Sequence, residues 1–518
     1  MLSVVESSAI FGVDAYGVRV EVNVAYTATL PGFTIVGLPD VAVNEARERV
    51  RAAIKNSGLS FPGDKRLTVN LAPADMKKAG PAFDLPIAVG LLLATSQIAE
   101  ENAAGCLFIG ELSLDGSVRP VTGVLPMAVW AKKSGYRRFV VPSANTGEAA
   151  IVGDIDVYPV DTLTDVLLLL ADWGSANPVR MDPAEALSRT VHSEWDFADV
   201  KGQSHVKRAL EVAAAGGHNV LLVGSPGSGK TMLARRLPTI LPPMTVDEAL
   251  EATKLYSITG LLPSGTALIS ERPFRSPHHT ISNAGLTGGG SYPRPGEVSL
   301  AHNGVLFLDE LPEFNRDVLE VMRQPLEDGQ VTIARAAASL TYPARFMLCG
   351  ALNPCPCGYF GDSLRQCTCK PESVKKYLNK LSGPLLDRID IHIEVPRLRH
   401  DELIAPPAGE RSAAIRGRVI VAREKQAARF RDEDASRKIY CNAHMGARQM
   451  QKHCPVTADA KSLLCAAITQ MSLSARAYDR ILKLARTISD LAGEDTIGIA
   501  HVAEAVQYRA LDRKFWGG

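Results

Sequence analysis

One stretch of eight residues constrains this chain more than any other, because it matches every fixed position of the pattern G-x-x-x-x-G-K-[ST]. An apolar run, residues 220–223, precedes it and predicts a buried strand, and residues 232–237 after it predict a helix. In that setting backbone amides surround phosphate oxygens, the lysine reaches the terminal phosphates and the threonine hydroxyl binds Mg²⁺. An ordinary glycine-rich turn is the disfavoured alternative. The predicted phosphate loop consists of Gly224, Ser225, Pro226, Gly227, Ser228, Gly229, Lys230 and Thr231.

Two further apolar runs end in polar residues suited to the same chemistry. Residues 305–308 predict a strand that ends in Asp309 and Glu310, where the first acid can bind Mg²⁺ and the second can orient the attacking water. Residues 346–352 predict another strand, which ends in Asn353, an amide able to contact the γ-phosphate or the water. A core strand with a polar end, or a turn-forming asparagine before proline, would explain each run separately. Together with the phosphate loop, they predict binding and hydrolysis of a nucleoside triphosphate.

Length and composition set the frame for this site. A chain of 518 residues predicts about three domains. Apolar residues make up 46% and the net charge is +1, so a basic surface has to be local. Neither a signal peptide nor an apolar run long enough to span a bilayer is evident, which predicts a cytoplasmic protein without membrane association. Residues 85–95 are apolar on all sides and predict a helix central to a core.

Four of the nine cysteines crowd into fifteen residues, as two C-x-C pairs separated by nine residues. A loop of this kind can close around one tetrahedral Zn²⁺, and four ligands leave no open position for catalysis. The spacing departs from the commoner C-x-x-C, so an iron–sulfur cluster remains an alternative, as does simple packing of the thiols. The predicted ligands are Cys355, Cys357, Cys367 and Cys369.

Segments outside these motifs offer surfaces for a substrate. Residues 272–296 are too rich in glycine and proline for a packed helix and predict a mobile loop. Residues 329–343 predict a β-hairpin with Arg335 near its tip, either a DNA-phosphate contact or an ordinary solvated charge. The basic stretch 411–431 predicts a helix that either binds a phosphate backbone or is simply solvated. Residues 459–507 predict three amphipathic helices.

The first 172 residues predict an α/β domain, and two of their motifs carry a resemblance. Residues 77–84 and 116–123 resemble the proteolytic domain of the Lon proteases, which has a ribosomal-protein S5 domain 2-like fold. Where that family has its serine nucleophile and lysine base, this chain has Ala82 and Met127. Without a hydroxyl or an amine there is no serine–lysine acylation, so we expect a non-proteolytic structural or binding domain.

Residues 196–398 resemble the AAA+ ATPases, in particular the magnesium-chelatase-like YifB or ComM family, and the resemblance to that family extends over almost the whole chain. The most specific stretches are residues 272–280, 353–358 and 382–390. The resemblance implies that Arg388 enters the nucleotide site of a neighbouring subunit, and that Arg476 is the second sensor arginine of a helical lid. A surface arginine paired with Asp387 is the alternative for Arg388, and Arg480 and Arg486 are alternatives for Arg476 in that role.

The predicted domains are therefore a Lon-like domain at 1–172, a linker at 173–195, an AAA+ domain at 196–398 with the cysteine insert at 355–369, and a helical lid at 399–518. The resemblance implies a homo-oligomer, a hexameric ring that uses ATP and Mg²⁺ to move branched, forked or single-stranded DNA in recombination and natural transformation. A chaperone-like remodeller of proteins and a magnesium-chelatase-type subunit are the alternatives.

Overall fold

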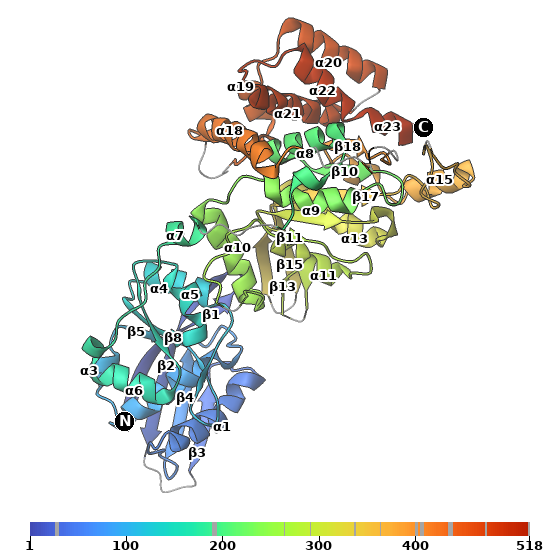
Figure 1. Cartoon of the computed structure of the whole chain (residues 1–518). Helices are drawn as coiled ribbons and strands as arrows, with labels where there is room; N and C mark the ends of the chain where they lie inside the picture. The colour runs from blue at the N-terminus through green and yellow to red at the C-terminus, as the bar shows by residue number, and fades with distance from the viewer. Residues whose placement is uncertain are drawn as a thin grey trace. The chain divides into compact units, whose positions relative to one another are not determined.

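The computed structural model describes all residues except 26–30, 189–193, 264, 291, 336–337, 363, 399–401, 403, 405–408, 434–438, 472–473 and 516–518. The chain divides into two compact units, of which the first comprises Met1–Thr190 with Thr245–Ser270 and the second comprises Val191–Met244 with Glu271–Gly518 (Figure 1). No helix among the described residues has the length and apolar character needed to cross a bilayer.

A mixed sheet of seven strands, counted over the described residues, lies at the centre of the first unit. Its order is β3-β4-β2-β1-β5-β8-β9. The longest pairing is antiparallel, between β1 and β2, whereas β5, β8 and β9 run parallel. The strands are β1 (Leu2–Phe11), β2 (Asp14–Ala25), β3 (Gly32–Val36), β4 (Arg66–Ala72), β5 (Cys106–Phe108), β8 (Arg138–Pro142) and β9 (Asp156–Val160).

Helices cover this sheet. Helix α2 (Asp84–Ala94) packs against β1 and β2, and every one of its residues is buried, which confirms the central helix predicted from its apolar sequence. Two-residue strands β6 (Glu111–Leu112) and β7 (Val118–Arg119) form a separate hairpin. The other helices are α1 (Val41–Asn56), α3 (Glu100–Ala103), α4 (Val124–Lys133), α5 (Thr146–Ala150), α6 (Leu163–Ala171) and α7 (Pro183–Ser188).

One helix joins the first unit from a distant part of the sequence. Residues 245–270, which the sequence analysis assigned to the range 196–398, contain α10 (Val246–Thr259) and pack within the first unit. Ser257 anchors the segment, because its hydroxyl donates to the buried carboxylate of Glu148 at 2.6 Å and its carbonyl accepts from the Gly123 amide at 3.0 Å. Such long-range contacts are not visible in local sequence patterns.

The second unit is built on a parallel sheet of five strands, again within the described residues, in the order β11-β14-β17-β10-β18. Its α/β character agrees with the predicted fold class. The strands are β10 (Val220–Val223), β11 (Phe274–Arg275), β14 (Val305–Leu308), β17 (Met347–Leu352) and β18 (Ile391–Glu394). The helices before the carboxy-terminal region are α8 (Ser204–Gly216), α9 (Lys230–Ile240), α11 (Asn283–Thr287), α12 (Glu297–Leu300), α13 (Arg316–Val321), α14 (Arg323–Asp328), α15 (Pro371–Leu378) and α16 (Gly383–Leu386).

The carboxy-terminal region is helical, and the three helices predicted within 459–507 all form. Helices α18 and α21 pack against α8 (Figure 1), and their apolar side chains share one core with the parallel sheet. The helices are α18 (Ser412–Phe430), α19 (Ala447–His453), α20 (Ala458–Met471), α21 (Ala475–Ala492), α22 (Ile499–Gln507) and α23 (Ala510–Phe515).

The two predicted inserts pack together. The expected hairpin forms from β15 (Gln330–Arg335) and β16 (Ala338–Pro343), and its tip at 336–337 lies outside the described residues. The expectation that 272–296 is a loop without a helix was wrong, since it contains α11 and the short strands β12 (Gly288–Gly289) and β13 (Arg294–Pro295). Two contacts hold this insert against the hairpin: Tyr342 donates a hydrogen bond to the Pro293 carbonyl, and Gly288 packs so closely on Ile333 that a Cβ there would lie 2.5 Å from its side chain. Within the insert, Leu286 of α11 is buried.

Candidate functional site

Three neighbouring strands bring the predicted phosphate and hydrolysis residues to one edge of the sheet. Strand β17 lies between β10 and β14, and all three run parallel. The phosphate loop follows β10, the Asp309–Glu310 pair follows β14 and Asn353 follows β17. Because the carboxyl ends of parallel strands meet at the same edge, residues far apart in the sequence face one site.

The phosphate loop has the backbone of an anion-binding turn. Gly227 and Gly229 have φ values of 75° and 93°, which residues with a side chain rarely adopt. The Lys230 ammonium lies inside the loop, where it donates to the carbonyls of Gly224 and Ser225 at 2.7 and 3.0 Å and to the Asn353 side-chain oxygen at 3.1 Å. Burial lowers the pKa of Lys230 to about 8, opposed by the nearby carboxylates.

The residues predicted to bind Mg²⁺ lie side by side. The Thr231 hydroxyl donates to the Asp309 carboxylate at 2.6 Å. Both oxygens are hard ligands of the kind that Mg²⁺ prefers, and the cation usually keeps several waters and phosphate oxygens as its other ligands. The pair therefore fits a magnesium ion bound together with a nucleotide.

Glu310 lies at the open side of the same edge, with its side chain 55% exposed. Its φ of 50° directs the chain away from the strand, into a turn that begins at Leu311. The imidazole Nδ1 of His279 lies 3.7 Å from the Glu310 carboxylate. This contact was not predicted from the sequence, although His279 belongs to the family-specific stretch 272–280.

Arg388 is bonded to residues of its own chain. Its side chain is only 7% exposed, donating to Glu327 at 2.5 Å and to the Pro384 carbonyl at 2.6 Å. The alternative of a surface pair with Asp387 was wrong, because the partner is Glu327. Entry of Arg388 into the site of a neighbouring subunit stays a prediction. The hydrogen bond from Arg388 lowers the pKa of Glu327, so that carboxylate stays ionised as its partner. Within one subunit, Arg388 is therefore buried in an ion pair and does not project outward.

The three candidate lid arginines have different surroundings. Arg480 donates to Asp390 at 2.7 Å, and the nearly buried Arg486 donates to Asp490 at 2.8 Å. Arg476, near the start of α21, is exposed. Of the three, Arg476 is the one whose guanidinium is open to solvent, whereas the other two contribute to the packing of the carboxy-terminal helices.

The four predicted metal ligands come together. Their Sγ atoms all lie within 4.8 Å of one another, with separations of 3.3 Å for Cys355–Cys357, 3.6 Å for Cys357–Cys367 and 3.7 Å for Cys355–Cys367. Four sulfurs at about 2.3 Å from a common ion would lie about 3.8 Å apart in a tetrahedron. Desolvation acts to raise the pKa of Cys357, but hydrogen bonds from the amides of Tyr359 and Thr368 lower it to about 5. The residues thus fit one metal ion.

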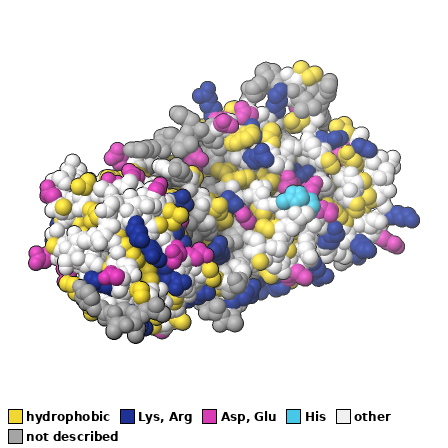
Figure 2. Space-filling view, turned by 90° about the horizontal axis from the view of Figure 1, so that it is seen from below, with side chains coloured by type: hydrophobic (Ala, Val, Ile, Leu, Met, Phe, Trp, Pro, Cys, Tyr) yellow, Lys and Arg dark blue, Asp and Glu magenta, His cyan; other side chains and the backbone are white. Residues whose placement is uncertain are grey.

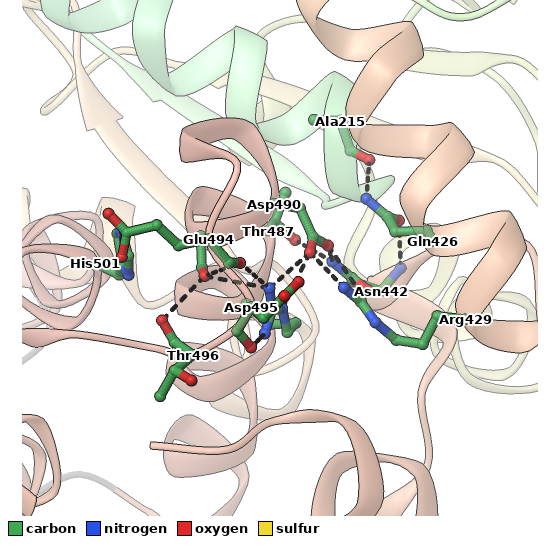
Figure 3. Close-up of polar contacts among 12 residues, drawn as sticks. Ala215, Gln426, Arg429, Asn442, Thr487, Asp490, Glu494, Asp495, Thr496 and His501 are labelled. Carbon is green, nitrogen blue, oxygen red and sulfur yellow. Dashed lines mark hydrogen bonds and ion pairs between the residues drawn. The ribbon is translucent and has the colours of Figure 1, made fainter. Parts of the chain in front are cut away.

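The two surfaces predicted to bind DNA, Arg335 on the hairpin and the basic stretch 411–431, differ in how far their arginines are exposed. Arg335 is exposed on the described part of the hairpin, as a phosphate contact requires. The basic helix α18 instead directs several arginines into the protein. Arg418 pairs with Glu211 and Glu410, and Arg429 and Asn442 both donate to the buried carboxylate of Asp490 (Figure 3). Arg418 and Arg429 are thus paired within the fold, whereas Arg411 and Arg431 at the ends of this stretch are exposed, so contact with a phosphate backbone stays a prediction.

The N-terminal unit contains no acylating pair at the predicted positions. Ala82 and Met127 lie in one buried apolar cluster, together with Val121 and Val124. A methyl group and a thioether have no proton to transfer and cannot attack a carbonyl. The cluster thus serves packing.

Comparison with protein families covers most of the chain. A profile described as magnesium chelatase, subunit ChlI, matches residues 196–403. A second, described as subunit ChlI of Mg-chelatase, matches residues 20–145, and a third, described as its C-terminal part, matches residues 409–509.

Individual relatives match along the whole chain. An uncharacterized protein YifB of Salmonella typhimurium is 44% identical over 515 residues, which cover 99% of this chain and 98% of the relative. The competence protein ComM of Haemophilus influenzae is 44% identical over 517 residues, with the same coverage of both chains. The 38 kDa subunit of magnesium chelatase from Rhodobacter capsulatus is 25% identical over 194 residues, 34% of this chain and 54% of that subunit.

Proposed function

This chain belongs to the YifB/ComM family of magnesium-chelatase-like AAA+ proteins, and we propose that it is an ATP-driven motor that acts as a hexameric ring on branched or forked DNA. The observation that supports this most is the meeting of the phosphate loop, the Asp309–Glu310 pair and Asn353 at the carboxyl edge of β10, β14 and β17. A relative that is named a competence protein supports the proposed role in natural transformation.

In the proposed hydrolysis, the residues of one subunit bind and orient the nucleotide. The loop amides and Lys230 would hold the phosphates, and Thr231 and Asp309 would hold Mg²⁺, whose charge would offset that of the phosphates. Glu310 accepts a hydrogen bond from the attacking water and directs its lone pair at the γ-phosphorus. Asn353, already 3.1 Å from Lys230, senses the γ-phosphate from the adjacent strand.

The proposed ring supplies the remaining positive charge. Arg388 of one subunit would leave its pairing with Glu327 and contact the nucleotide of the next subunit, where it stabilises charge on the transferring phosphoryl group. Arg476, exposed on α21, would contact the nucleotide of its own subunit when the carboxy-terminal helices close over it. Release of Arg388 on assembly would tie hydrolysis to ring formation.

The DNA part of the proposal rests on fewer residues. Exposed Arg335 is placed on a hairpin of the kind that reaches into the pore of a ring, where it would contact a phosphate. On the face drawn in Figure 2, cationic side chains occur in separate groups interspersed with acidic ones, which agrees with a net charge of +1. Local contacts rather than a broad basic field would therefore hold the DNA.

Two other functions each have one supporting observation. A chaperone-like remodeller of proteins, with the N-terminal unit as its docking surface, is favoured by the nearly neutral net charge. A magnesium-chelatase-type subunit is favoured by the family profile over residues 196–403. Hydrolysis of ATP is common to all three, whereas dependence on DNA separates the first from the others.

We further propose that the four cysteines bind one structural zinc ion. Thiolate ligands suit zinc, and sulfurs within 4.8 Å of one another leave space for one ion but not for the several irons of a cluster. Purified protein should accordingly contain about one zinc per chain. In Cys367→Ser the metal content should fall to near zero and the melting temperature should drop, because metal-binding energy is local folding energy.

The exposed Cys465 supplies the matched control, since Cys465→Ser removes a thiol outside the cluster and should retain the metal. Elemental analysis after purification under reducing conditions checks both variants. Several irons per chain in place of zinc would support the cluster alternative, and wild-type protein without any metal would contradict the site.

A direct test of the proposed activity is ATP turnover by the purified chain. We expect hydrolysis that requires Mg²⁺ and stops in EDTA, because Thr231 and Asp309 are arranged for a cation. Absence of turnover with and without DNA, in protein shown to be folded and oligomeric, would contradict the motor.

A further inference from the structure

The cysteine insert and the phosphate loop make direct contact, which neither sequence motif indicates. Asp362 lies between the two C-x-C pairs, and its Oδ2 accepts a hydrogen bond from the Ser225 hydroxyl at 2.5 Å. Ser225 is the second residue of the phosphate loop, and its carbonyl also accepts from Lys230 at 3.0 Å. Asp362 of the insert is therefore hydrogen-bonded directly to a residue of the loop that would bind the phosphates.

Asp362 also organises its own loop. Its other oxygen, Oδ1, accepts from the backbone amides of Leu364 and Arg365 at 2.8 and 2.9 Å. The hydrogen bonds, led by that from Ser225, lower the pKa of Asp362, so the carboxylate is ionised at neutral pH. One charged side chain thus joins the two segments: its Oδ2 bonds the phosphate loop and its Oδ1 bonds the insert.

Two more contacts support the same connection. Gly358, the residue after Cys357, packs so closely on Pro226 of the phosphate loop that a Cβ there would lie 2.5 Å from the proline ring. Its φ of 84° also favours glycine. On the other side, Cys355 is two residues beyond Asn353, the side chain that contacts Lys230.

We propose that the insert is a metal-dependent clamp on the phosphate loop, in which the four-cysteine metal site positions Asp362 against Ser225 so that metal binding and nucleotide binding strengthen each other. The inference rests on the proposed nucleotide site. Metal removal frees the insert and with it Ser225, so the loop has to be ordered when ATP binds, and that ordering lowers affinity. Because coupling between two sites is reciprocal, bound nucleotide retains the metal in turn.

Nucleotide affinity of the full-length protein tests the clamp, measured with a fluorescent ATP analogue and paired with the metal content of the same sample. Asp362→Ala should keep the metal, since its ligands are untouched, and should bind nucleotide about tenfold more weakly, a size typical of coupling between sites. Leu364→Ala is the matched control, because this exposed side chain belongs to the same loop, and it should bind as wild type does.

Two comparisons distinguish a clamp from a general loss of structure. Removal of the metal by a chelator should weaken nucleotide binding by wild type about tenfold, and should have little further effect on Asp362→Ala. In a double-mutant cycle, Asp362→Ala and Ser225→Ala should be strongly non-additive, because both remove the same hydrogen bond.

Metal-loaded Asp362→Ala that binds nucleotide as tightly as wild type would overturn the clamp and leave the proposed ATPase intact. Tighter binding by that variant would also overturn it, since it would show that the carboxylate repels the phosphates. Wild-type protein that binds no nucleotide in either metal state would overturn the proposed function itself.

Discussion

Glu310→Gln is expected to bind ATP with nearly wild-type affinity and to hydrolyse it about 10²- to 10⁴-fold more slowly, the usual range for loss of a general base. The amide keeps the shape of the side chain but cannot accept a proton from water. Glu310 is more than half exposed at the strand end, outside the phosphate loop, so its charge contributes little to ground-state binding. Single-turnover hydrolysis and equilibrium binding, measured on the same preparation, separate the two effects.

Lys230→Ala provides the comparison, because it should lose nucleotide binding and not only hydrolysis. Its ammonium lies within the loop, bonded to two loop carbonyls, so its loss removes ground-state contact with the phosphates and should abolish measurable binding. Glu313→Gln is the control for the loss of a negative charge nearby. The Glu313 carboxylate is paired with Lys380 at 3.6 Å and has no role in the proposed hydrolysis. Equal loss of binding in Glu310→Gln and Lys230→Ala would contradict the role given to Glu310.

Arg388→Ala is expected to keep nucleotide affinity and ring assembly but to lose about 10³-fold or more in turnover, as removal of a transition-state arginine does. The structure adds a condition, because Arg388 is paired with Glu327 within its own subunit. Glu327→Gln should weaken that pairing and free the arginine, so it should keep turnover. ATPase assays across a range of protein concentrations check both variants.

Mixing of two inactive variants tests whether Arg388 acts between subunits. Rings of Lys230→Ala and Arg388→Ala contain some interfaces at which an intact loop faces an intact arginine, so part of the ATPase activity should return. Either variant mixed with itself is the control. Mixed rings confirmed by mass spectrometry that regain no hydrolysis would show that the arginine does not act in trans.

The nucleotide site could be predicted in detail because it is a local pattern. The phosphate loop and the two strand ends each combine an apolar run with a polar residue that only a few functions explain, and parallel pairing of β10, β17 and β14 brings them together. The cysteine cluster was predictable for the same reason, since four ligands within fifteen residues can close around an ion without help from the rest of the fold.

The predictions that failed depend on contacts between distant segments. Nothing close to Arg388 in the sequence indicates that Glu327, sixty-one positions earlier, is its partner. Residues 272–296 are rich in glycine and proline, but Leu286 is buried and Tyr342 of the hairpin donates to the Pro293 carbonyl, and these contacts order the insert. Helix α18 has the charge of a DNA-binding surface, yet Arg429 forms an ion pair with Asp490, a residue of another helix. A local sequence pattern indicates what chemistry a side chain can perform, but it does not indicate which distant residue the side chain contacts.

The central claim is that ATP hydrolysis drives movement along DNA, and the rate of hydrolysis with and without a forked DNA duplex tests it most directly. Strand displacement is followed in the same reaction, and Glu310→Gln serves as the inactive control. We expect forked DNA to raise the ATPase rate several-fold and strands to separate only with hydrolysable ATP. Arg335→Ala should weaken the response to DNA and leave the basal rate unchanged. An active ATPase whose rate is the same with every DNA structure, and which separates no strands, would contradict it.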